Sequence, residues 1–253
     1  MTFAMVRSAV QFALMMCIGV AGGFGAAVAQ SKISDDDLLK ALRAGGHAIV
    51  MRHAAADPDK ADTNPTNFKN VRTQQPLTEQ GRAAAKAFGE FLRVAGVPIG
   101  EVLTSRFNRC VQTALLAGYK QAKPVTELTE GSLVASPNEQ RRRASALKQL
   151  LAAPINDGTN RLLVTHRANV TQAFGKEWYE VKEGEASIFR VANGSYSLVA
   201  RVQIDEWARI AQAGANKAPA AAPPVAAPQA PPQAATPAPA PAANAAPPPA
   251  KQP

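Results

Sequence analysis

Three short apolar runs of the chain, residues 48–51, 101–105 and 161–165, each end on cationic side chains. Those side chains are, in chain order, Arg52 with His53, Arg106, and His166 with Arg167. Guanidinium groups bind the oxygens of a phosphate-like dianion, and a neutral imidazole can attack phosphorus and become phosphohistidine. If one pocket gathers these residues, one histidine can act as the nucleophile while the other cationic groups neutralise the transferred phosphoryl group.

The elements that must position these residues alternate between strands and helices. The expected strands are 48–51, 101–105, 124–128 and 161–165, followed by a hairpin that turns at Asn193 and Gly194. Helices are predicted after the N-cap Ser34, across 77–96, from Ser105, after the capping box of Ser136 and Glu139, and from about Asn169. Apolar strands without alternation are typical of a sheet covered on both faces. The sequence therefore predicts a three-layer α/β/α sandwich with a mostly parallel central sheet.

The position of the cationic residues in that fold suggests a binding pocket. Ligands of parallel α/β sheets bind outside the carboxyl ends of the strands, which is where these residues are expected. Arg106 is expected in the first turn of its helix, where a cation opposes the helix dipole unless an anion is bound nearby. The pattern therefore favours a pocket for an anionic substrate, in keeping with the net charge of +9.

Four segments in order, VMRHA, LTEQGRAAAKAFGEFL, VLTSRFNRCVQTA and LLVTHRANV, resemble the histidine phosphatase superfamily, with its phosphoglycerate-mutase-like fold. The resemblance extends roughly over residues 46–205 and is closest to exported proteins of branch 1. It implies that His53 is the phosphorylated nucleophile and that His166 is the second pocket histidine. It also implies that Arg52 and Arg106 are phosphate ligands. No cofactor is expected.

The sequence departs from the family pattern at two positions next to the histidines. Ala54 stands where the family usually has glycine after its Arg-His pair. Arg167 stands where glycine or asparagine is common after the second histidine. Neither change removes a catalytic side chain, and Arg167 is expected to bind substrate by narrowing or recharging the pocket mouth.

The family also needs an acid that protonates the leaving oxygen, and two glutamates are candidates. Glu130 follows the expected strand 124–128, where many members place this acid, while Glu185 precedes the hairpin. Either carboxyl must keep its proton part of the time, which burial can arrange by raising its pKa. Glu130 is slightly favoured.

Other interpretations of the same residues are weaker. His47 is expected to be a structural histidine at the strand entrance, and Cys110 a small core residue. A zinc hydrolase using all three histidines is disfavoured because the neighbours are arginines instead of carboxylates. A serine hydrolase is disfavoured because the chain lacks a GxSxG motif.

Both ends of the chain differ in composition from the middle. Residues 1–29 show the charge, apolar core and small-residue order of a signal peptide, with cleavage expected near Ala29. Residues 215–253 are rich in Ala and Pro and are expected to be a disordered tail that could contact the envelope. One domain is expected at 31–214, in the periplasm or secreted, with no nucleic-acid partner and no stable membrane insertion after cleavage.

The sequence thus leads to one main hypothesis and one alternative. The main hypothesis is an exported, metal-independent phosphatase that hydrolyses small phosphomonoesters through phosphohistidine. The alternative is a non-catalytic envelope module that binds a phosphorylated ligand in the same basic pocket.

Overall fold

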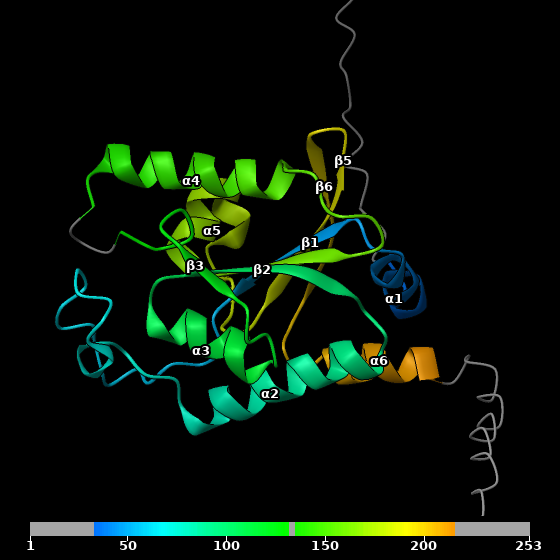
Figure 1. Ribbon diagram of the computed structural model, residues 1–253, viewed down its shortest axis with the longest axis horizontal. Coiled ribbons are helices and arrows are strands. Elements are labelled where there is room, and N and C mark those ends of the chain that lie inside the picture. The colour runs from blue at the N-terminus through cyan, green and yellow to red at the C-terminus, as the bar shows by residue number, and fades with distance from the viewer. Residues whose placement is uncertain (1–32, 132–134, 216–253) are drawn as a thin grey trace, which may run out of the picture.

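The computed structural model describes residues 33–131 and 135–215, which form a six-stranded sheet between two layers of helices (Figure 1). The strands are β1 (His47–Arg52), β2 (Ile99–Ser105), β3 (Lys123–Val125), β4 (Asn160–Thr165), β5 (Ala186–Ala192) and β6 (Ser195–Val202). The helices are α1 (Asp35–Ala44), α2 (Glu79–Val94), α3 (Asn108–Leu116), α4 (Pro137–Ala152), α5 (Arg167–Phe174) and α6 (Trp207–Ala215), with 3-10 turns at Val71–Thr73 and Lys176–Trp178. The expected signal peptide and nearly all of the expected tail lie outside the described residues.

The sheet is mostly parallel, as predicted. Its order is β3-β2-β4-β1-β5-β6, and β3, β2, β4 and β1 all run in the same direction. The last two strands form an antiparallel hairpin, which pairs with β1 through β5. The hairpin turns at Asn193 and Gly194, whose φ angles of 51° and 70° are those that a tight two-residue turn needs.

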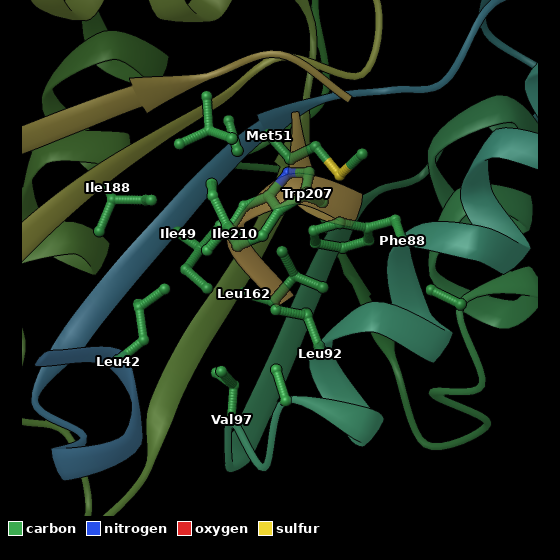
Figure 2. Packing of buried hydrophobic residues seen from close by; sticks show 14 of the residues in the cluster. Leu42, Ile49, Met51, Phe88, Leu92, Val97, Leu162, Ile188, Trp207 and Ile210 are labelled. Atoms are coloured by element: carbon green, nitrogen blue, oxygen red, sulfur yellow. The ribbon is translucent and has the colours of Figure 1, made fainter. Parts of the chain in front are cut away.

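Apolar side chains cover both faces of the sheet, which explains why its central strands do not alternate. On one face, α1, α2, α3 and α6 pack over Ile49 and Leu162, with Phe88 of α2 against Trp207 of α6 (Figure 2). On the other face, α4 and α5 pack over Val50 and the neighbouring strand residues. The three-layer α/β/α sandwich is therefore confirmed. Within the described part of the chain, every helix is too short or too polar to cross a membrane.

The register between β1 and β4 positions the ends of two strands at the same level. Arg52 pairs with Thr165 across the parallel ladder, so the chain leaves the two adjacent strands into His53 and His166 side by side. The backbone N–H of His53 then donates to the carbonyl of Thr165 at 3.0 Å. The two histidines are thus neighbours because of the sheet, although 112 positions in sequence lie between them.

At the opposite end of the central strands, Asn160 and His47 connect the start of β4 to the start of β1. The amide of Asn160 donates to the carbonyls of Leu42 and Pro98 at 2.7 and 2.9 Å and accepts from the backbone of His47 at 3.1 Å. Nδ1 of His47 lies 2.8 Å from the carbonyl of Gly45. His47 is therefore at the amino end of β1, away from the carboxyl end where Arg52 and His53 lie.

Several predicted boundaries differ from those of the structure. The helix expected from Ser105 begins at Asn108, because β2 continues through Ser105 and Phe107 is the extended N-cap residue. The helix expected near Asn169 begins at Arg167, and β3 ends at Val125. The N-caps Ser34 and Ser136 are confirmed, since their side chains accept from Asp37 and Glu139 backbone N–H groups.

Candidate active site

A cavity of about 600 Å³ opens at the carboxyl ends of β1 and β4. Its lining includes five ionisable side chains from four segments of the chain: Arg52 and His53, Arg109, Glu130, and His166. Arg167 lines the same cavity from the start of α5. The structure therefore brings together all of the sequence-predicted site residues except Arg106.

Arg106 lies outside the cavity, and Arg109 occupies the position expected for it. The guanidinium of Arg106 is exposed and stacks 4.4 Å from the ring of Phe68. Because α3 begins at Asn108, Arg106 precedes the helix instead of belonging to its first turn. Arg109 is only 2% exposed and lies one turn before Thr113 on the inner face of α3. That spacing along the predicted apolar stripe is the sequence signal that could have identified it.

His53 is held in a form that suits a nucleophile. Its Nδ1 lies 2.9 Å from the carbonyl of Ala54, so Nδ1 carries the proton and donates it, which leaves the Nε2 lone pair available. Burial, followed by the charges of Arg109 and Arg52, lowers the pKa of His53 to about 3. The imidazole is therefore neutral at physiological pH.

The backbone around His53 is fixed by two neighbouring segments. The N–H of Ala54 donates to Oγ1 of Thr113 at 3.1 Å, and the N–H of Gly184 donates to the carbonyl of His53 at 2.9 Å. Ala54 has no positive φ, so the methyl group at this position, where the resemblance led us to expect glycine, is tolerated without strain.

His166 lies beside His53, with ring centroids 5.3 Å apart. Its Nε2 is 2.7 Å from Oγ of Ser105, which itself accepts from the backbone N–H of Phe107. The Ser105 hydroxyl can thus donate to Nε2, which places the imidazole proton on Nδ1. Burial and the nearby charge of Arg109 lower the pKa of His166, so this residue is a neutral donor.

Three buried nitrogens of the cavity residues have no hydrogen-bond partner within the described part of the chain. They are Nε of Arg52, Nε of Arg109 and Nδ1 of His166. The last lies 3.3 Å from Oε1 of Glu130 without forming a hydrogen bond. Buried donors without acceptors cost about 1–3 kcal/mol each, and an oxyanion bound between them would remove that cost.

Glu130 and Glu185 lie in very different surroundings. Glu130 lines the cavity, where burial raises the pKa of its carboxyl against the opposing charge of Arg109. Glu185 is 1% exposed and lies outside the cavity lining, where its carboxylate accepts from Arg201, Gln203 and the backbone of Lys182. Of the two candidate acids, only Glu130 can reach a ligand bound between the histidines.

The remaining candidates have other surroundings. Arg167 is exposed at the cavity rim, with its guanidinium 5.9 Å from the ring of Tyr179. Cys110 is fully buried with its Sγ 3.5 Å from the carbonyl of Thr165, and burial raises the pKa of its thiol. Across 33–131 and 135–215, no group of three or more His, Cys, Asp or Glu side chains is placed to hold a metal ion.

Comparison with known proteins matches part of the chain to one family. Residues 48–131, about a third of the chain, match the model of the histidine phosphatase superfamily, branch 1. This segment contains Arg52, His53, Arg109 and Glu130. The resemblance to the histidine phosphatase superfamily seen in the sequence is therefore confirmed over residues 48–131.

Several solved structures of low sequence identity also match the chain. The protein histidine phosphatase SixA, complexed with tungstate, is 22% identical, with 63% of this chain and 98% of that chain covered and a TM-score of 0.47. A phosphoserine phosphatase from Entamoeba histolytica is 14% identical, with 62% and 97% covered and a TM-score of 0.47. The alpha-ribazole phosphatase from Shigella flexneri is 17% identical, with 60% and 94% covered and a TM-score of 0.45. No curated protein sequence matches the chain.

The buried neutral histidines predict that the protein loses stability on mild acidification. The pKa values of His53, His166 and His47 are all lowered by burial, so between about pH 6.5 and pH 5 the unfolded chain binds protons that the folded protein does not. Each histidine then removes up to about 1.4 kcal/mol of stability per pH unit. Glu130 acts in the opposite sense, because its raised pKa lets the folded protein hold a proton.

Urea unfolding between pH 8 and pH 5 measures this effect. The free energy of unfolding should fall as the pH drops below about 6.5, and the slope should be smaller in His166→Gln, which cannot take up a proton. A free energy that stays constant or rises over this range contradicts the assigned neutral state.

Proposed function

We propose that the protein is an exported, metal-independent phosphatase that hydrolyses small phosphomonoesters through a phosphohistidine on His53. The observation that carries the proposal is a neutral, oriented imidazole in a cavity whose lining includes three residues, Arg52, Arg109 and His166, that each keep a buried nitrogen without a partner in the described part of the chain. A nucleophile among cationic and hydrogen-bond-donating groups is what transfer of a phosphoryl group requires.

The reaction has two steps with opposite proton movements. In the first, the Nε2 lone pair of His53 attacks phosphorus, the P–O bond to the leaving group breaks, and Glu130 gives its proton to the leaving oxygen. In the second, water attacks the phosphohistidine, the P–N bond breaks, and the Glu130 carboxylate takes a proton from the water. Inorganic phosphate leaves, and both side chains return to their starting states.

The other cavity residues bind the phosphoryl group. Arg52 and Arg109 supply positive charge from β1 and α3, and Nδ1 of His166 donates from the end of β4. Arg167 at the rim is assigned to the leaving group. We assign the second phosphate arginine to Arg109, because Arg106 stacks on Phe68 outside the cavity.

Export is part of the proposal and is supported by the signal-like order of residues 1–29. A periplasmic or secreted enzyme would meet phosphorylated sugars or envelope components, and the Ala/Pro-rich tail could extend toward an envelope partner. The chain would require neither a cofactor nor nucleic acid.

Replacing the proposed nucleophile should abolish turnover. In His53→Ala, hydrolysis of an aryl phosphate should fall by roughly 10³-fold or more, because no other described side chain offers the same lone pair to the ligand. Affinity for inorganic phosphate should remain, since the arginines are intact. His47→Gln, at the other end of β1, is the matched control and should keep its activity.

The same assay separates the competing functions. Turnover should be insensitive to excess chelator and should yield an acid-labile phosphoenzyme in rapid-quench experiments. Phosphate affinity without hydrolysis in the wild type would favour the non-catalytic module, and loss of activity with chelator would favour a metal enzyme.

The proton donor can be identified by its dependence on the leaving group. Glu130→Gln should slow an alkyl phosphate by about 10²–10⁴-fold while affecting an activated aryl ester much less, because the better leaving group needs no proton. Glu185→Gln is the control, and it should change both substrates by the same factor. If Glu185→Gln instead slowed only the alkyl phosphate, Glu185 and not Glu130 would be the proton donor.

The two neighbouring arginines provide a matched pair. Arg109→Gln should lower kcat/KM by about 10²–10³-fold, because it removes a buried charge that faces the phosphoryl group. Arg106→Gln should change kcat/KM by less than about threefold, since solvent already screens the exposed guanidinium. Steady-state kinetics on one phosphate ester tests both, and a larger loss in Arg106→Gln would restore that residue as the phosphate ligand.

A further inference from the structure

Arg109 is shared by two carboxylates that come from different parts of the chain. One terminal nitrogen, Nη1, donates to Oδ1 and Oδ2 of Asp62 at 3.2 and 2.9 Å. The other, Nη2, donates to Oε1 of Glu130. The guanidinium also stacks 4.4 Å from the ring of Phe107, so it is held on three sides. Its orientation therefore depends on Asp62 as well as on Glu130.

Asp62 belongs to the long segment between β1 and α2, drawn in cyan in Figure 1. Its Oδ1 also accepts from the backbone N–H of Gln75 at 2.8 Å, which ties the middle of the segment to its last residues. The side chain of the preceding residue, Gln74, accepts from the backbone N–H of Asn108 at 2.7 Å and so fixes the segment to the first residue of α3. Asp62 is thus held on the helix that carries Arg109.

The shared guanidinium has a consequence for Glu130. Charged or titratable groups lie around Glu130 on several segments: Arg109 and Cys110 on α3, Arg52 at the end of β1 and His53 directly after it, His166 after β4, Arg167 at the start of α5, and Asp62 in the long segment. Burial raises the pKa of Glu130, and the negative charge of Asp62 adds to this effect. The positive charges of Arg109 and Arg52 act in the opposite direction. With one half of the Arg109 fork occupied by Asp62, the carboxyl of Glu130 is less fully neutralised.

We infer that Asp62 is a positioning residue that shares the Arg109 guanidinium with Glu130. Through this shared contact, Arg109 stays oriented toward the phosphoryl group and Glu130 keeps its proton. The inference rests on the proposed function, because it concerns the acid of that reaction. Asp62 does not line the cavity and acts through its two neighbours.

The test removes the charge of Asp62 and keeps its shape. In Asp62→Asn, the pKa of Glu130 should fall by about one unit, because a like charge is lost and the cation is left to Glu130 alone. The ¹³C NMR shift of the labelled Glu130 carboxyl, assigned by its disappearance in Glu130→Gln, measures that pKa directly. For an alkyl phosphate, the basic limb of the kcat–pH profile should move to lower pH by the same amount.

Two further variants separate charge from structure. Asp57→Asn removes a carboxylate from the same segment, one that pairs with exposed Lys60 outside the main cavity, and should leave both readouts unchanged. Asp62→Glu retains the charge and should return the pKa of Glu130 toward its wild-type value. Circular dichroism melting confirms that each variant is folded.

An unchanged pKa of Glu130 in Asp62→Asn overturns the inference, as does an equal shift in Asp57→Asn. The NMR titration needs no turnover, so it decides the inference even if the wild type hydrolyses no ester. In that event the proposed function fails on its own evidence.

Discussion

The arrangement of the site depends on the parallel pairing of β1 with β4. Arg52 lies opposite Thr165, and the next residue on each strand is a histidine. A shift of one residue in this register would turn the alternating strand side chains toward opposite faces of the sheet. Two distant parts of the sequence therefore form one site because buried backbone hydrogen bonds align them.

Cations gathered at the end of a sheet create an electrostatic problem, which acidic partners solve in part. Arg52 is paired with Glu183 and with the carbonyl of Val181, and Arg109 is paired with Asp62 and Glu130. Each guanidinium nevertheless keeps one buried Nε without a partner in the described part of the chain. The two imidazoles add no charge because burial and the arginines hold them neutral. The protein side of the site is therefore stable but incomplete, and a bound oxyanion would complete it.

Local patterns predicted the elements, and their limits explain what was missed. Apolar strands and helix caps depend on nearby residues, so β1, β4 and the start of α4 were recognisable in the sequence. The start of α3 was not, because its N-cap residue Phe107 makes no side-chain cap hydrogen bond. Because the predicted start of the helix was three residues too early, Arg106 was predicted as the cavity arginine in place of Arg109. The role of Asp62 depends on a segment folding back onto α3, which no local pattern indicates.

The two buried glutamates show why burial alone does not define a catalytic acid. Glu185 is the more buried, yet its oxygens accept from Arg201 and Gln203, and its backbone carbonyl accepts from Arg52. These contacts hold Glu185 in the turn that brings Val181 and Glu183 to Arg52, so Glu185 has a structural role next to Arg52. Glu130 shares one guanidinium with a second carboxylate and faces the cavity. A proton donor must be a carboxyl whose charge is left partly uncompensated where substrate binds, and only Glu130 meets both conditions.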